Sequence, residues 1–294
     1  MSLLKGRLGL ETARIPHADR HGLVYLERGQ LYVEDGTLRF RAAGGSTLDA
    51  GDYAIPYQAV SLVLLGPGSQ VSHDSLRLLA RHGTGLVAVG EGAVKLYSAP
   101  QIGPDDSTLA RRQARCWADA EGARLGIARR MYAWRFGEVL PHEDIAVLRG
   151  MEGSRLKELY RLLAEKHGVG WKGRRYDRQD PTAADLPNQA INHAATCVEA
   201  AAMVAVAATA TIPQLGFIHE DSGNSFVLDV ADLYRATVTL PLAFAAAKAI
   251  EKNPARTLER EVRQRAVMAF RQEGLIPAMI DRIKELFDGG DRHP

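Results

Sequence analysis

The hydrophobic pattern of this chain changes its period near residue 100. Up to residue 98, apolar runs are short, end at glycine or proline, or alternate with polar residues, as strands do. From residue 108 onwards, apolar and small residues recur three, four or seven positions apart, which is typical of amphipathic helices. We therefore expect a two-domain α+β protein, with a small β-rich N-terminal domain at 1–98, a linker at 99–107 and a larger all-α-helical C-terminal domain at 108–294.

Local signals refine this division. Asp35 and Gly36 separate two alternating runs and predict a β-hairpin, because both tolerate the positive φ of a type I′ turn. Ser72 precedes HDSLRLLARHG and is a candidate cap for a single short helix. In the second half, the spacing of apolar residues predicts helices at 108–135, 143–167, 186–210, 229–251, 255–273 and 276–288.

Composition excludes several classes of protein. The 294 residues are 46% hydrophobic and 24% charged, as in ordinary globular proteins. The only two cysteines, Cys116 and Cys197, provide neither a disulfide framework nor a zinc site, which favours a cytoplasmic location. The most apolar run, at 200–213, is too short to span a bilayer, and the N-terminus lacks the apolar core of a signal peptide. We expect a buried core helix there and no membrane association.

Cations gather in two places in the second half. The 108–135 segment carries seven arginines against Asp119 and Glu121, and WKGRRYDR at 171–178 adds four cations and two aromatic residues. One such cluster is often only a solvated helix face, but arginine and lysine also neutralise phosphates while aromatic rings stack on bases. Two clusters favour a nucleic-acid partner, with the candidate contacts Arg111, Arg112, Arg115, Arg129, Arg130, Lys172, Arg174, Arg175 and Arg178.

A histidine and several acids lie among apolar residues in LGFIHEDSGNSFVLDVADLYR, at 215–235. Asp229 and Asp232 stand where a helix is expected to begin, so they are candidates for the cap and the first turn, and their spacing places both on one side of that turn. His219 is either a hydrogen-bonded core residue or a ligand that the short following loop returns to the helix start. Helix capping and metal binding both remain open for these residues.

A third acid, Glu152, stands between Gly150 and Gly153 in LRGMEGSRLKELY. Each glycine costs a helix about 1 kcal/mol relative to alanine, so the pair predicts close approach of another segment or of a ligand. The alternative is a surface glutamate that pairs with Arg149 or Arg155 at three residues' distance. The residues alone leave both interpretations open.

These motifs, in this order, resemble the CRISPR-associated adaptation integrases, and most closely their subtype I-E branch. LRGMEGSRLKELY, LGFIH and SFVLDVADLYR carry the resemblance, together with GWKGRRYDRQDPTAADLPNQAINHAATC between the first two, and it extends over nearly the whole chain. One departure is the pair Glu220-Asp221, where close relatives usually have Thr-Gly after the histidine.

The resemblance implies a metal-dependent DNA endonuclease and integrase that joins a protospacer 3′-hydroxyl to the repeat boundary. Its catalytic residues would be Glu152, His219, Asp229 and Asp232, of which Glu152, His219 and Asp232 bind Mg²⁺ or Mn²⁺. The implied partners are a protospacer duplex, the CRISPR repeat, a small companion adaptation protein and a second copy of the chain, with dimerisation through the N-terminal domain.

Two other functions fit part of the sequence. A non-catalytic DNA-binding scaffold would use the arginine clusters and leave the acids as caps. A metallophosphoesterase acting on small substrates would use the acids and leave the arginine clusters without a role.

Overall fold

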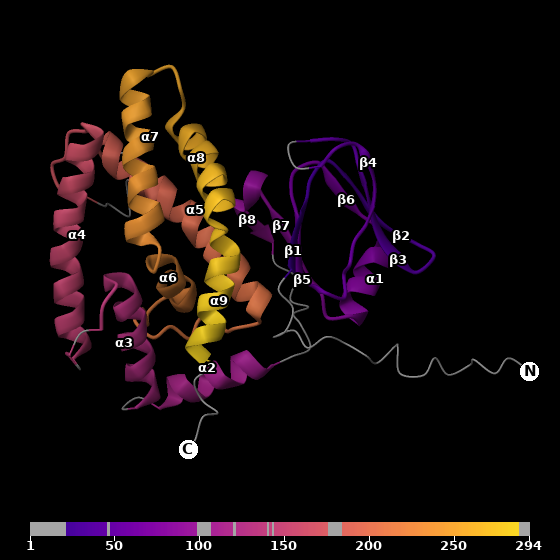
Figure 1. The fold of residues 1–294 in the computed structure, drawn as a ribbon, viewed down its shortest axis with the longest axis horizontal. Coiled ribbons are helices and arrows are strands. Elements are labelled where there is room, and N and C mark those ends of the chain that lie inside the picture. The colour runs from indigo at the N-terminus through magenta and orange to yellow at the C-terminus, as the bar shows by residue number, and fades with distance from the viewer. Residues whose placement is uncertain are drawn as a thin grey trace, which may run out of the picture.

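The computed structural model describes residues 22–45, 48–98, 107–119, 122–139, 141–142, 144–175 and 184–287. A strand-rich part is followed along the chain by a helical part (Figure 1). This arrangement confirms the predicted α+β fold class. Apart from Ser107, the predicted linker at 99–107 lies outside the described residues, as does the start of the predicted N-terminal domain.

Two four-stranded sheets make up the strand-rich part. The first has the order β1 (Gly22–Leu26), β5 (Val60–Leu65), β7 (Gly85–Val89) and β8 (Leu96–Ser98), and only β7 and β8 pair antiparallel. The second has the order β4 (Gly51–Ala54), β3 (Thr37–Ala42), β2 (Gly29–Glu34) and β6 (Ser69–Val71). The predicted hairpin is confirmed: β2 and β3 pair antiparallel, and Asp35 and Gly36 between them have φ of 49° and 75°.

The inner strand β5 of the first sheet is buried on both faces, which explains why its sequence VSLVLL is apolar at all positions but Ser61. On one face, Leu62, Leu64 and Val87 belong to a core shared with the helical part. On the other face, Val63 packs in a second core with the second sheet and α1 (His73–Arg81). Ser72 caps α1 as predicted, since its hydroxyl accepts the backbone N–H of Ser75 at 3.2 Å.

The helical part is built around α5 (Leu186–Thr209), which contacts α6, α7, α8 and α9 (Figure 1). The remaining elements are α2 (Thr108–Ala118), α3 (Ala123–Phe136), α4 (Ile145–His167), α6 (Ser225–Asp232), the π-helical segment η3 (Arg235–Thr239), α7 (Leu240–Lys252), α8 (Leu258–Glu273) and α9 (Leu275–Phe287). By length and composition α5 could cross a membrane, but 61% of its most apolar window is buried inside the protein. It is the buried core helix that the sequence predicts.

The prediction of one helix over 108–135 is wrong. The first helix ends at Ala118 and the next begins at Ala123. The carboxylate of Asp119 accepts the backbone N–H groups of Gly122, at 3.1 Å, and Ala123, at 3.0 Å. An aspartate that satisfies the free amides at a helix start favours a new helix over continuation of the old one.

The prediction of one helix over 229–251 is also wrong. The segment divides into α6, η3 and α7, with a backbone hydrogen bond from the Thr239 N–H to the Tyr234 carbonyl, five residues back, at 3.1 Å. Pro241, in the first turn of α7, has no N–H to continue the regular ladder. Short π-helical segments of this kind are frequent beside functional sites.

A close contact joins the strand-rich part to α8. Gly92 lies in the short 3₁₀ helix η2 (Glu91–Ala93) with φ of 61°, and a Cβ built there would clash with Cγ2 of Val267. Gly137, after the end of α3, has φ of 74°, yet a Cβ there would meet nothing within 4 Å. The two glycines share a backbone conformation and differ in their surroundings.

We expect Gly137→Ala to lower the free energy of unfolding by about 1 kcal/mol, the usual cost of a left-handed backbone for alanine. Gly92→Ala should cost about 1–3 kcal/mol more because it also overpacks the contact with Val267. Urea unfolding followed by far-UV circular dichroism measures both losses. Adding Val267→Ala to Gly92→Ala should recover part of the extra loss, because it removes the methyl groups that the new Cβ would meet. Equal losses for the two glycine variants would contradict the close contact.

Candidate active site

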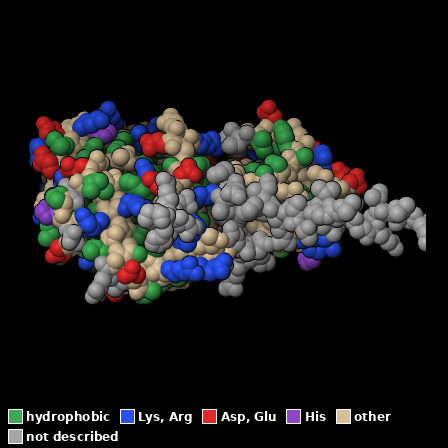
Figure 2. Space-filling model, turned by 60° about the horizontal axis from the view of Figure 1, so that its bottom comes forward, with side chains coloured by type: hydrophobic (Ala, Val, Ile, Leu, Met, Phe, Trp, Pro, Cys, Tyr) green, Lys and Arg blue, Asp and Glu red, His purple; other side chains and the backbone are tan. Residues whose placement is uncertain are grey.

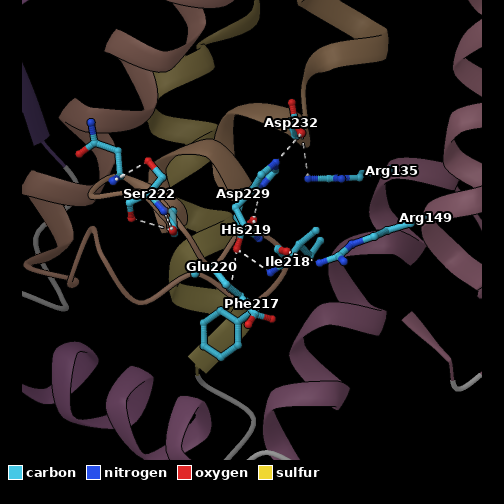
Figure 3. Close-up of polar contacts among 12 residues, drawn as sticks. Arg135, Arg149, Phe217, Ile218, His219, Glu220, Ser222, Asp229 and Asp232 are labelled. Atoms are coloured by element: carbon cyan, nitrogen blue, oxygen red, sulfur yellow. Dashed lines mark hydrogen bonds and ion pairs between the residues drawn. The ribbon is translucent and has the colours of Figure 1, made fainter. Parts of the chain in front are cut away.

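Asp229 anchors the candidate site from inside α6. Its side chain is 0% exposed, and its Oδ2 accepts the backbone N–H groups of Phe217, at 2.6 Å, and Ile218, at 3.0 Å (Figure 3). Its Oδ1 accepts the backbone N–H of His219 at 2.9 Å. The predicted N-cap role is therefore wrong: α6 begins at Ser225, and Asp229 satisfies the amides of the preceding loop instead of those of its own helix.

The same carboxylate orients the imidazole of His219. Nδ1 of the ring lies 2.7 Å from Oδ1 of Asp229, and this hydrogen bond raises the pKa of His219 above its ordinary value. Nε2 is left facing Asp232, whose Oδ2 lies 3.8 Å away. The side chain is 38% exposed, so His219 is not the core residue that one alternative predicted. Metal-binding histidines commonly have one ring nitrogen held by a carboxylate in this way.

Asp232 is the last residue of α6 and not part of its first turn, contrary to the prediction. Its Oδ2 faces His219 and lies 3.5 Å from Nη2 of Arg135. Its Oδ1 accepts Nη1 of Arg235 at 3.3 Å. The three-residue spacing from Asp229 still places both carboxylates towards the 217–219 loop, as predicted for one side of a helical turn.

Glu152, on α4, pairs with an arginine that the sequence did not single out. Its Oε1 accepts Nη1 of Arg135 at 2.8 Å, so one guanidinium contacts both Glu152 and Asp232. Arg149 and Arg155, the predicted surface partners, bind elsewhere: Arg149 donates to the Ile218 carbonyl at 2.6 Å, and Arg155 pairs with Glu138.

The glycines beside Glu152 do not mark a close approach of another described segment. A Cβ built at Gly150 or at Gly153 would meet nothing within 4 Å. No other segment among the described residues therefore approaches these glycines, whereas the approach of a ligand stays a prediction. The acid between them does belong to the site.

Glu152, His219 and Asp232 line one open cleft together with Arg135 and Arg149. Within the described part of the chain, no three histidine, cysteine or acidic side chains lie close enough to hold a metal ion as they stand. The guanidinium of Arg135 accounts for this because it lies between the two carboxylates. The donor set itself, one imidazole and two carboxylates, suits Mg²⁺ or Mn²⁺.

A second hollow is also lined by Asp232. Glu199 of α5 lines it with Asp232, Arg174 and Arg235. Burial, with the nearby Asp232 charge adding to it, raises the pKa of Glu199. Nothing in the local sequence of this alanine-rich helix distinguishes Glu199 as a neighbour of the site.

Two elements of the predicted 108–135 helix hold the loop that carries His219. Nε1 of Trp117 donates to the Gly216 carbonyl at 3.0 Å, and Arg124 pairs with Glu220 at 3.0 Å. Arg124 also lies over the ring of Trp117, 4.9 Å from its centroid. The unusual acid after the histidine therefore has a structural partner on α3.

The nine predicted nucleic-acid contacts divide in the structure. Arg112 donates to the Phe287 carbonyl at 3.4 Å, and Arg130 donates to the carbonyl of Glu285 at 3.1 Å, so both bind the C-terminal end of α9. Arg174 donates to the side-chain oxygens of Asn188 and Asn192. These three arginines therefore have partners within the protein.

The side chains of Arg111, Arg115, Lys172 and Arg175 are exposed, that of Arg129 is half-buried, and Arg178 lies outside the described residues. Figure 2, which turns the lower side of the molecule forward, shows lysine and arginine side chains gathered in a row along its lower edge. The structure thus keeps exposed cations available on the helical part.

The fold defined by these elements is shared with a protein solved in complex with DNA and with a casposase bound to its integration product. The crystal structure of the TtCas1–DNA complex matches with a TM-score of 0.82 at 32% identity, covering 94% of this chain and 100% of that one. A casposase bound to its integration product matches with a TM-score of 0.62 at 13% identity and shows the fold alone.

A family model described as CRISPR associated protein Cas1 matches residues 135–271, a range that includes all four predicted catalytic residues. CRISPR-associated endonuclease Cas1 1 of Rhodospirillum rubrum is 38% identical over 94% of this chain and 87% of its own length. CRISPR-associated endonuclease Cas1 of Escherichia coli is 36% identical over 95% and 89%. The chain belongs to the Cas1 family, which confirms the resemblance that the sequence motifs indicated.

The buried carboxylate of Asp229 accepts hydrogen bonds from three backbone N–H groups and is hydrogen-bonded to one ring nitrogen. We therefore expect Asp229→Asn to lower the free energy of unfolding by about 2–4 kcal/mol. Asp221→Asn, on the exposed loop nearby, should change it by less than about 0.5 kcal/mol. Urea unfolding of both variants measures the difference. An Asp229→Asn protein as stable as wild type would contradict the anchoring role.

Proposed function

We propose that this chain is a CRISPR adaptation integrase, a metal-dependent DNA endonuclease and transesterase. It joins the 3′-hydroxyl of a protospacer to the phosphodiester at the repeat boundary. The observation that carries the proposal is the oriented His219: its Nδ1 is held by buried Asp229, and its Nε2 faces Asp232 in a cleft that Glu152 also lines. This occurs in a chain of the Cas1 family.

Nε2 of His219 and the carboxylates of Asp232 and Glu152 would hold a Mg²⁺ or Mn²⁺ ion. When bound, such an ion supplies Lewis-acid stabilisation of the negative charge that develops on the phosphate oxygens. Asp229 would keep the imidazole in the tautomer and orientation that leave Nε2 available, because its Oδ1 would accept a hydrogen bond from the Nδ1–H group.

The cationic side chains around the cleft would position the DNA backbone. Arg149 donates to the Ile218 carbonyl beside His219, and this hydrogen bond holds its guanidinium in the lining of the cleft. Fixed cations that face a reacting phosphate stabilise its added charge without reorganising during the reaction. No serine or cysteine nucleophile is required, because the attacking group is the DNA 3′-hydroxyl.

The partners follow from this function. The substrates are a protospacer duplex and the CRISPR repeat, which the exposed cations of the helical part would contact through phosphates. We propose that the chain works as a homodimer with a small companion adaptation protein, in the cytoplasm, where the CRISPR locus lies.

The metal site is tested by strand transfer. Wild-type protein with its companion, a labelled 3′-hydroxyl duplex and a repeat-bearing plasmid should give joined product in Mn²⁺ and none in EDTA. His219→Ala should lower the rate about 100-fold or more, because the ligand that Asp229 orients is lost. His73→Ala, at an exposed position in the first turn of α1, is the matched control and should leave the rate unchanged.

The same assay separates the alternatives. Transfer that persists in EDTA or in His219→Ala would refute the metal site. A protein that binds duplex but gives neither transfer nor cleavage would be a scaffold. One that hydrolyses only small phosphodiesters would be a metallophosphoesterase.

DNA binding has a separate signature in salt. We expect Arg111→Ala combined with Arg115→Ala to weaken duplex binding uniformly across sequences and to reduce the slope of log affinity against log salt by about 2. Fluorescence anisotropy over a range of KCl concentrations measures this slope. Arg161→Ala, an exposed arginine of α4 that pairs with Glu158, is the control and should leave it unchanged. An unaltered slope in the double variant would show that the exposed arginines of α2 do not contact the DNA phosphates.

A further inference from the structure

Arg135 is an unusual member of the candidate site because it is a cation buried between acids. It lies near the C-terminal end of α3, its side chain is 5% exposed, and it contacts Oε1 of Glu152 and Oδ2 of Asp232. Figure 3 shows the guanidinium directed at Asp232, with His219 on the other side of that carboxylate. Arg135 therefore holds the position where the two acids of the proposed metal site meet.

The oxygen that Arg135 faces is the one that matters for a metal ion. Oδ2 of Asp232 also lies 3.8 Å from Nε2 of His219. Arg235 binds the other oxygen, Oδ1, and is anchored by the Tyr160 hydroxyl at 3.1 Å. Arg235 can therefore keep its place when Oδ2 takes a new partner, whereas Arg135 cannot keep its place.

Arg135 is only partly satisfied where it lies. Nε and Nη2 are buried and have no hydrogen-bond partner among the described residues, and Nη2 meets Asp232 only at ion-pair distance. Buried donors without partners are costly, so this arrangement holds the side chain less firmly than a fully bonded one would. Arg135 lines both the cleft beside His219 and a separate hollow that Leu156 also lines, so the side chain has open space next to it.

We propose that Arg135 is an internal counter-ion that competes with a divalent metal for Glu152 and Asp232. It keeps the two carboxylates neutralised and poised, and metal binding displaces its guanidinium into the adjoining cleft. This inference rests on the metal site of the proposed function and assigns Arg135 a positioning role in it. The apparent metal affinity is then the intrinsic affinity multiplied by the fraction of molecules in which Arg135 is not paired with the two carboxylates.

The test is metal binding without DNA. Isothermal titration calorimetry with MnCl₂ should show that Arg135→Met binds Mn²⁺ about tenfold or more tightly than wild type. Arg149→Met removes the same charge from the same cleft without touching either carboxylate, and it should change the affinity by less than about threefold. His219→Ala added to Arg135→Met should abolish the gained affinity.

A second measurement uses the wild-type protein and does not depend on the folding of a variant. In ¹⁵N-labelled protein, the Nε–H signal of Arg135, identified by its loss in Arg135→Lys, should shift on Mg²⁺ titration with the midpoint of metal binding. A signal that stays fixed while metal binds would overturn the displacement.

The outcomes separate this inference from the proposed function. If wild type joins DNA in Mn²⁺ but Arg135→Met binds the ion no more tightly than Arg149→Met, the counter-ion role is wrong and the function stands. If Arg135→Met binds Mn²⁺ more tightly than wild type but the wild-type protein gives no strand transfer, the proposed function is wrong and the counter-ion role stands. Failure of both wild type and Arg135→Met to bind Mn²⁺ overturns the inference.

Discussion

One buried carboxylate, that of Asp229, determines the arrangement of the whole site. It accepts hydrogen bonds from the backbone N–H groups of three consecutive loop residues and is hydrogen-bonded to one ring nitrogen, and it is fully buried. Hydrogen bonds to an ionised group are roughly twice as strong as neutral ones, so loop and helix behave as one rigid unit. The direction of His219, and with it the approach of Nε2 to Asp232, follows from this unit.

The surrounding fold brings three further helices to that unit. α5 forms the centre of the helical part, and the first sheet packs onto the same core, so the strand-rich half supports the helices that carry the site. α3 contributes Arg135 and α4 contributes Glu152. Because this core is continuous, the position of these side chains depends on packing across the helical part and the first sheet.

The break between α2 and α3 distributes the arginines among distinct roles. Arg112 and Arg130 bind carbonyls at the end of α9, Arg124 holds the loop after His219, and Arg135 balances the acids of the cleft. Exposed cations such as Arg111 and Arg115 remain for a polyanion. A cluster that reads as one basic helix in the sequence therefore serves capping, site assembly and surface charge.

The sequence by itself determined the features that local interactions decide. The Asp35-Gly36 turn, the Ser72 cap, the buried alanine-rich helix and the order of the motifs around Glu152, His219 and Asp232 were all predictable, because each depends on neighbouring residues or on a simple period. Only the tertiary structure decided that Asp229 binds a loop instead of capping its helix and that Arg135 joins Glu152 to Asp232. Their partners come from other turns and helices, and helix packing, which no local pattern encodes, brings them together.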